Sequence, residues 1–242
     1  MVSYAVMAKY KRVLLKVSGE QLAGEMESGI DPKVVTWLSS QIKPLFNEGV
    51  QIVIMVGGGN FVRGAQLAGH GIKRVTADHM GMLGTMMNAL AVTDIFEAQG
   101  VATRCLTNIF AEQVAEPFVH RLANKHLENG RLVIVGGGSG RPYVTTDTAA
   151  LILALELDCD VVLKATKVDG VYESDPAHNA DAKRYDAISF QDAVSDGDIR
   201  VMDKAALGLA MDYKLPIIVY DFNADGALAS IIDGDNVGTK IG

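Results

Sequence analysis

Cysteine, aromatic residues and net positive charge are all scarce in this chain of 242 residues. The two cysteines, Cys105 and Cys159, form no CxxC pair, so a disulfide scaffold or a zinc ribbon is disfavoured and both thiols are expected to be small buried groups. Aromatic residues make up 6% of the chain, with one tryptophan, and the formal net charge is -7. Because nucleic-acid affinity comes mainly from neutralising phosphates, no nucleic-acid partner is expected, and any phosphate binding must be local.

Several segments and motifs are also absent. No apolar run approaches the ~18 residues of a membrane span, and residues 1–10 lack the apolar core and cleavage site of a signal peptide. We therefore expect a cytoplasmic protein without a membrane partner. There is no GxxxxGK[ST] loop, neither glycine-rich loop fits GxGxxG, and the five histidines form no HExxH motif. A P-loop kinase, a Rossmann oxidoreductase and a permanent metal site are all disfavoured.

What the chain does contain is a regular alternation of strand and helix signals. Hydrophobic residues make up 49% and charged residues 21%, which is typical of a globular protein. Strands are predicted at 12–17, 51–56, 102–106, 132–135, 160–164 and 217–220, and helices at 32–47, about 78–97, about 117–128, after 147, and about 202–212. A hairpin-like segment is predicted after residue 164 and an exposed loop at 177–184. Alternation of this kind indicates βαβ units and a largely parallel sheet covered on both faces, here in a single domain over 1–242.

Two triple-glycine loops, 57–59 and 136–138, each follow an apolar strand directly. Glycine permits a positive φ and removes the Cβ, so consecutive N–H groups can converge on an anion, aided by the N-terminus of a following helix. The alternative is a pair of tight turns without a ligand. Phosphate binding is the interpretation we favour for two such loops at the ends of parallel strands.

Cations stand close to these loops in the sequence. Lys16 and Lys164 end apolar strands, and Arg63 follows the first loop. An unpaired ammonium group is costly away from water, so the three cations together indicate a polyphosphate ligand, although each alone could be solvated. Asp147 begins a helix and could be its N-cap, while Asp78, Asp175 and Asp203 could be turn or cap residues.

Blocks of sequence then carry a resemblance that covers almost the whole chain in order. They are Lys16 to Glu20, Gly57 to Asn60 with Arg63-Gly64, Asp78 to Met82, Thr145 to Asp147, and Lys164 to Tyr172. Together they resemble the bacterial-type UMP kinases of the amino acid kinase family. The resemblance implies a three-layer αβα sandwich with a mostly parallel open sheet. It also implies transfer of the γ-phosphate of ATP, with Mg²⁺ carried by ATP, to UMP, giving UDP and ADP.

The resemblance assigns roles residue by residue. The catalytic set it implies is Lys16, Lys164, Asp147, Arg63 and Asp203, with Asp147 organising the lysines or the metal rather than acting as a strong base. The ATP set it implies is Lys16, Val17, Ser18, Gly19, Gly59, Arg63, Thr166, Tyr172 and Asp175. The UMP set it implies is Gly58, Asp78, Ser139, Gly140, Arg141, Pro142, Tyr143, Val144, Thr145 and Thr146, in which Asp78 holds the ribose.

One departure from the family pattern is visible, because Arg141 stands where the family commonly has asparagine. It puts base selectivity and regulation in doubt. The resemblance further implies a homohexamer activated by GTP and inhibited by UTP, with UMP bound mainly by the N-terminal part and ATP by residues from about 160. Two alternatives stay open: a relative in the family that acts on a carboxylate, carbamate or small phosphate, and a non-catalytic nucleotide- or oxyanion-binding protein for storage or regulation.

Overall fold

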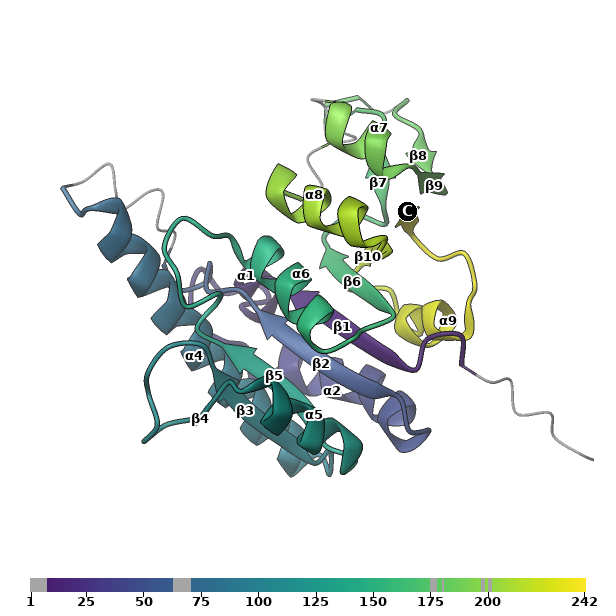
Figure 1. The fold of residues 1–242 in the computed structure, drawn as a ribbon. Helices are drawn as coiled ribbons and strands as arrows, with labels where there is room; N and C mark the ends of the chain where they lie inside the picture. The colour runs from purple at the N-terminus through teal and green to yellow at the C-terminus, as the bar shows by residue number, and fades with distance from the viewer. Residues whose placement is uncertain (1–7, 63–70, 175–177, 180, 197–198, 200–201) are drawn as a thin grey trace, which may run out of the picture.

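A single mixed sheet runs through the molecule in the computed structural model, which describes residues 8–62, 71–174, 178–179, 181–196, 199 and 202–242 (Figure 1). Within these residues nine strands follow the order β4-β3-β5-β2-β1-β6-β10-β11-β9. The strands are β1 (Arg12–Val17), β2 (Gln51–Val56), β3 (Thr103–Thr107), β4 (Glu116–Pro117), β5 (Leu132–Gly136), β6 (Val161–Thr166), β9 (Ala187–Ile188), β10 (Ile217–Asp221) and β11 (Thr239–Ile241). The pair β10–β11 is antiparallel and the other pairs are parallel, which confirms the predicted sheet type.

Helices cover both faces of the sheet. The described helices are α1 (Gly19–Leu22), α2 (Pro32–Asn47), α4 (Arg74–Ala98), α5 (His120–Glu128), α6 (Thr146–Glu156), α7 (Phe190–Ser195), α8 (Lys204–Tyr213) and α9 (Ala227–Asp233). Buried side chains of α2, α4 and α9 share one hydrophobic cluster, and those of α5, α6 and α8 share the other. Figure 1 shows the second group in front of the strands. This arrangement confirms the expected three-layer αβα sandwich.

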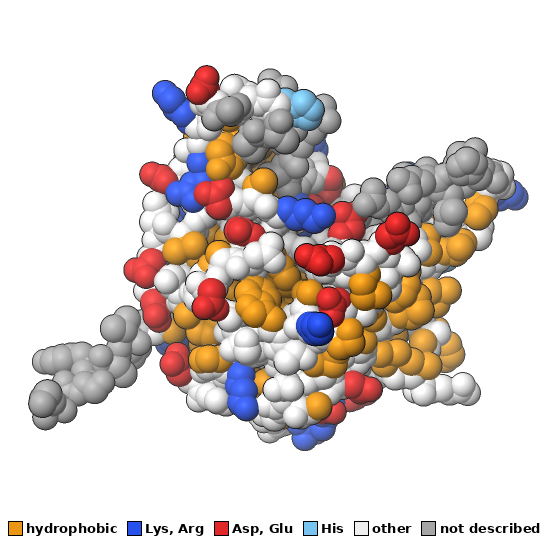
Figure 2. Space-filling view, turned by 180° about the vertical axis from the view of Figure 1, so that it is seen from behind, with side chains coloured by type: hydrophobic (Ala, Val, Ile, Leu, Met, Phe, Trp, Pro, Cys, Tyr) orange, Lys and Arg blue, Asp and Glu red, His pale blue; other side chains and the backbone are white. Residues whose placement is uncertain are grey.

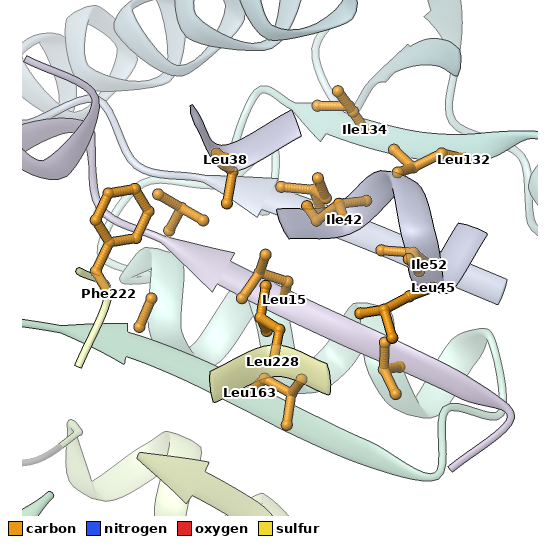
Figure 3. Close-up of a cluster of buried hydrophobic side chains, with 14 of the residues drawn as sticks. Leu15, Leu38, Ile42, Leu45, Ile52, Leu132, Ile134, Leu163, Phe222 and Leu228 are labelled. Atoms are coloured by element: carbon orange, nitrogen blue, oxygen red, sulfur yellow. The ribbon is translucent and has the colours of Figure 1, made fainter. Parts of the chain in front are cut away.

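Successive side chains of the central strands point alternately into these two clusters. In β1, Leu15 packs into the α2 cluster shown in Figure 3, whereas Leu14 packs into the α6 cluster on the opposite face. Successive side chains of a strand point to opposite faces, so a strand covered on both sides must be apolar throughout. Lys16 breaks that rule in β1, and as the next residue after Leu15 it points to the α6 side of the sheet.

The predicted helix at 117–128 begins late, because Glu116 and Pro117 form the short edge strand β4 beside β3. The predicted strand ending at Lys164 continues to Thr166. The hairpin-like segment exists as β7 (Val171–Tyr172) paired antiparallel with β8 (Arg184–Tyr185), although a long loop joins the two strands. Of the predicted loop at 177–184, Arg184 therefore belongs to a strand. The short elements α1, α7, α9, β9 and β11 were not predicted from the sequence.

In the part of the chain that the structure describes, no helix is both long enough and apolar enough to cross a membrane.

Candidate active site

Two lysines meet one carboxylate at the carboxyl end of the central strands. Lys16 of β1 is paired in register with Lys164 of β6, so their side chains emerge together on the α6 face. Asp147, in the first turn of α6, lies between them, with Oδ1 2.8 Å from the Nζ of Lys16 and Oδ2 2.6 Å from the Nζ of Lys164. The three side chains are only 11%, 15% and 12% exposed for Lys16, Asp147 and Lys164 respectively. The structure thus brings together three residues of the predicted catalytic set.

The charges of this trio depend on one another. Burial by itself would raise the pKa of Asp147, but the adjacent ammonium groups of Lys16 and Lys164 outweigh it and hold that pKa below its ordinary value. Burial lowers the pKa of Lys164, and the nearby Lys16 lowers it further, while Asp147 opposes both effects. A carboxylate held ionised in this way is a counterion for the lysines and a poor proton acceptor. The sequence left open that Asp147 is the N-cap of its helix. The structure shows that Thr145 is the N-cap of α6 instead.

The first glycine loop owes its composition to close approach. None of Gly57, Gly58 and Gly59 has a positive φ. A Cβ on Gly58 would instead lie 2.5 Å from the carbonyl oxygen of Gly81 in α4 and 2.9 Å from the Thr85 nitrogen. Likewise, a Cβ on Gly19 would lie 2.8 Å from the nitrogen of Gly59. The loop is therefore packed closely between α1 and α4, and the N–H of Gly57 donates to the carbonyl oxygen of Val17 at the end of β1.

A pair of buried amides fixes this loop from behind. Asn88 of α4 donates from Nδ2 to the carbonyl oxygen of Gly57 and to Oδ1 of Asn60, and Asn60 donates back to Asn88. Both side chains are buried. Sequence reasoning missed Asn88, although an asparagine within the apolar stretch from Met86 to Leu90 was a usable signal, since buried amides need partners.

The second glycine loop uses positive φ as predicted. Gly137 and Gly138 have φ values of 80° and 54°. The N–H of Gly137 donates to the hydroxyl of Thr85 in α4, and the side-chain amide of Asn108 donates to the carbonyl oxygen of Gly138. Thr85 and Asn108 are further supporting residues that the sequence analysis missed. Among the described groups, no backbone hydrogen bond engages the N–H of Gly58, Gly59 or Gly138, and all three glycines line the cavity described next.

A cavity of about 210 Å³ lies between the two loops, α4 and the start of α6. Its described lining residues are Gly58, Gly59, Val62, Arg74, Ala77, Asp78, Gly81, Met82, Thr85, Gly138, Ser139, Val144, Thr145 and Thr146. Seven of these belong to the predicted UMP or ATP sets. A second cavity of about 570 Å³ shares Ser139 and adds Gly140 and Arg141, together with His79, Leu83, Asn108, Ile109 and Phe110. Pro142 and Tyr143 line neither cavity.

The carboxylate of Asp78 is held at the edge of the smaller cavity. Its Oδ1 accepts from the Nε of Arg74 at 2.7 Å, and its Oδ2 accepts from the backbone N–H of Tyr143 at 2.8 Å. Burial would raise the pKa of Asp78, but these two hydrogen bonds outweigh it and keep the pKa below the ordinary value. Asp78 lies within helix α4, so it is neither a cap nor a turn residue. Whether it also holds a ribose stays a prediction.

Asp203 is a cap residue, as one alternative from the sequence proposed. It accepts from the N–H groups of Ala205 and Ala206 at the start of α8, and also from the hydroxyls of Thr145 and Thr148. Because Thr145 caps α6, Asp203 ties the starts of α6 and α8 together. It therefore supports the helix that carries Asp147.

Of the residues predicted around ATP, Val17 to Gly19 lie at the end of β1, Gly59 follows β2, Thr166 ends β6 and Tyr172 belongs to β7. Ser18 is the N-cap of α1, in a capping box with Gln21, and Val17 and Gly19 flank it. The hydroxyl of Thr166 donates to the carbonyl oxygen of Val168, and the hydroxyl of Tyr172 donates to Asp169, which raises the pKa of Tyr172. Arg63 and Asp175 lie outside the described residues. Over the described ranges, no three His, Cys, Asp or Glu side chains cluster as a metal site.

Comparison with known proteins agrees with this geometry. The model of the amino acid kinase family matches residues 11–221. The structure is similar to that of UMP kinase from Bacillus anthracis, at 41% identity and a TM-score of 0.92 over 96% of each chain. It is also similar to UMP kinase from Ureaplasma parvum, at 30% identity and a TM-score of 0.89 over 96% of this chain and 98% of that one. Uridylate kinase from Archaeoglobus fulgidus matches at 26% identity and a TM-score of 0.75, over 95% and 99% of the two chains.

The lowered pKa of Asp147 gives a test of the lysine trio. The charge of Asp147 stabilises the folded state above its unfolded pKa of about 4, and this contribution is lost as the pH falls through the lower folded pKa. Asp147→Asn should therefore cost roughly 3–5 kcal/mol of unfolding free energy at pH 7, because it leaves two ammonium groups without their counterion, and less at pH 3. Denaturant unfolding at both pH values measures this, with the exposed Asp212→Asn as control. An equal loss at both pH values would contradict the assignment.

Proposed function

This chain belongs to the amino acid kinase family, and on that premise we propose that it transfers the γ-phosphate of ATP to UMP, giving ADP and UDP. The observation that carries the proposal is the pairing of Lys16 and Lys164 on Asp147 beside a glycine-lined cavity. The similarity to UMP kinases over nearly the whole chain supports UMP as the acceptor. The reaction fits a role in pyrimidine nucleotide synthesis, and we place it in the cytoplasm.

The chemistry needs positive charge and positioning more than it needs a base. Phosphoryl transfer passes through a loose, in-line transition state with negative charge on the equatorial oxygens, and a phosphate acceptor is already ionised. Lys16 and Lys164 are placed to neutralise the transferring group, and Asp147 holds both ammonium groups at one point. The open N–H groups of Gly58 and Gly59 add donors between the two substrates. Asp147 itself moves no proton.

Magnesium enters as part of the substrate MgATP. Both oxygens of Asp147 face ammonium groups, so the described part of the site offers no set of carboxylates for a resident metal. Mg²⁺ usually binds to the phosphates of a nucleotide, to several waters and to only one or two protein carboxylates. A site with few available carboxylates can therefore accept Mg²⁺ that arrives bound to ATP.

The two substrates occupy different parts of one domain in this proposal. UMP lies in the N-terminal part, with its phosphate at Gly58 and Thr146 and its ribose at Asp78 in the smaller cavity. The base lies toward Ser139, Gly140 and Arg141, with Pro142, Tyr143, Val144 and Thr145 completing the segment. ATP lies over the ends of β1 and β6, at Val17, Ser18, Gly19, Gly59, Thr166 and Tyr172, with Arg63 and Asp175 completing its set, and Asp203 supports α6 and α8.

Removal of one ammonium group tests the catalytic assignment. Lys164→Ala should lower kcat by at least about 100-fold, because a charge aimed at the transferring phosphate is lost. A coupled ADP-release assay with UMP measures it, and Lys33→Ala, which removes an exposed lysine at the start of α2, is the control. Unchanged turnover in Lys164→Ala would remove this residue from the phosphoryl site.

Asp78 gives a separate test of the acceptor side. Asp78→Ala should raise KM for UMP by about tenfold and change kcat and KM for ATP much less, because its carboxylate lines the acceptor cavity and holds the loop at Tyr143. Steady-state kinetics with each substrate varied in turn measures the split. Asp233→Ala, on the exposed side of α9, is the control. An equal rise in KM for ATP contradicts the assignment.

The alternatives are separated by a substrate panel. UMP, CMP, dCMP, aspartate, glutamate and carbamate are offered to the enzyme with ATP, and ADP and the phosphorylated product are measured. Formation of a carboxyl or carbamoyl phosphate in place of UDP would identify a relative with another acceptor. No turnover on any acceptor, with nucleotide still bound, would identify a binding protein. The ratio of UMP to CMP turnover reports the effect of Arg141.

We extend the proposal to a homohexamer, activated by GTP and inhibited by UTP. Exposed apolar side chains on α4 and the loop after β3 support self-association, and Figure 2 shows hydrophobic side chains gathered on that side of the molecule. These exposed apolar side chains include Leu83 and Met87 on α4, and Phe110 and Val114 in the loop after β3. Patches of this kind mark interaction surfaces.

Light scattering tests this assembly. The wild type should have the mass of a hexamer, and Leu83→Asp/Met87→Asp a lower mass, because charge in the interface opposes its burial. Tyr213→Asp, on the exposed side of α8, is the control. A monomeric wild type rejects the assembly, and turnover unaffected by GTP and UTP rejects the regulation.

A further inference from the structure

Arg74 belongs to none of the catalytic or substrate sets above, yet it lines the smaller cavity. We propose that Arg74 is a positioning residue, which with Asp78 and Tyr143 forms a clamp that fixes the wall of the acceptor cavity. The identity of the acceptor in this inference rests on the proposed function. The clamp itself rests on contacts between two segments that are far apart in the sequence.

Three contacts close the clamp. Arg74 is the first residue of α4, and its Nε donates to Oδ1 of Asp78 one turn later, at 2.7 Å. The other oxygen of Asp78 accepts from the backbone N–H of Tyr143. The guanidinium carbon of Arg74 lies 5.4 Å from the centre of the Tyr143 ring, within the range of a cation–π contact. Each of the three residues therefore touches the other two.

The clamp holds a residue that would not stay in place by itself. Tyr143 has a φ of 67°, in the left-handed region that a side chain disfavours. The residue is 68% exposed, so burial in the core does not fix it either. Among the described contacts, those with Arg74 and Asp78 oppose the strain. Their loss should release the loop from this conformation.

The position of Tyr143 affects the cavity wall because the next three residues form part of that wall. Val144, Thr145 and Thr146 line the cavity, and Thr145 also caps the helix that carries Asp147. Arg74 has a second effect on the same space. It offsets the negative charge of Asp78, which would otherwise repel the dianionic phosphate of an incoming acceptor.

The alternative interpretation is that Arg74 and Asp78 form an ordinary surface salt bridge between helix residues four apart, since the Arg74 side chain is 47% exposed. Such pairs contribute little to stability. If the pair is only a surface salt bridge, replacing Arg74 should leave acceptor binding unchanged. If Arg74 is part of the clamp, its replacement should weaken binding of the acceptor and leave binding of ATP unchanged.

Kinetics of Arg74→Gln separate the two readings. The clamp predicts a rise in KM for UMP of about tenfold, with kcat within about threefold and KM for ATP and the melting temperature unchanged. Arg74→Lys should restore part of the loss, because it keeps the charge beside Asp78 and loses the planar contact with the ring. Arg121→Gln, on the exposed side of α5, is the control. An unchanged KM for UMP, or an equal rise for ATP, overturns the proposal.

A double-mutant cycle locates the coupling. Tyr143→Ala and Arg74→Gln should each raise KM for UMP, and the double variant should raise it little beyond either one, because both remove the same contact. Fully multiplicative effects overturn the clamp.

Hydrogen exchange without substrate keeps the clamp testable if UMP is not the acceptor. The amide of Tyr143 should exchange at least about tenfold faster in Arg74→Gln than in the wild type and in Arg121→Gln. Equal exchange in all three overturns the clamp. Absence of UDP formation by the wild type overturns the proposed function and leaves the exchange result to decide the clamp.

Discussion

Asp147 holds two ammonium groups that would otherwise repel each other at the buried end of adjacent strands. With both lysines protonated the trio carries one net positive charge, in a place where water can screen it only weakly. A further anion is therefore favoured there. The chain as a whole is acidic, so this local excess of positive charge favours an anion at a place where the net charge of the protein would disfavour one. The fold places Asp147 between the two lysines, and its negative charge offsets the cost of burying two ammonium groups side by side.

Helix α4 organises the rest of the site around that charge. On one side it meets the first glycine loop through Gly81 and Asn88, and on another it meets the second loop through Thr85. Its first turns add Asp78 to the cavity edge. One rigid helix thus sets the distance between two loops that come from different strands. Small residues and buried polar groups in α4 serve this purpose, at the expense of a continuous apolar face.

The sequence predicted the central strands well because each is a short apolar run that ends in or near a glycine or a charged residue. It also singled out Lys16 and Lys164, since an ammonium group in a buried strand demands a partner, and the structure places both against Asp147. The sequence did not identify Asp147 as the partner of those lysines, because an aspartate that follows threonine at the start of a helix is also typical of an N-cap. Asn88, Thr85 and Asn108 were missed for a related reason. Their role depends on which backbone groups of distant loops come within reach, and this is a property of packing.

The register of β1 against β6 has a consequence for how the protein is made. Lys16 is synthesised before Asp147 and Lys164, from which it is far apart in the sequence, and the three meet only when the two strands pair. An unfinished chain that exposes the first strand and glycine loop lacks the second ammonium group and its counterion. The trio of Lys16, Asp147 and Lys164 therefore forms only once the centre of the sheet has closed.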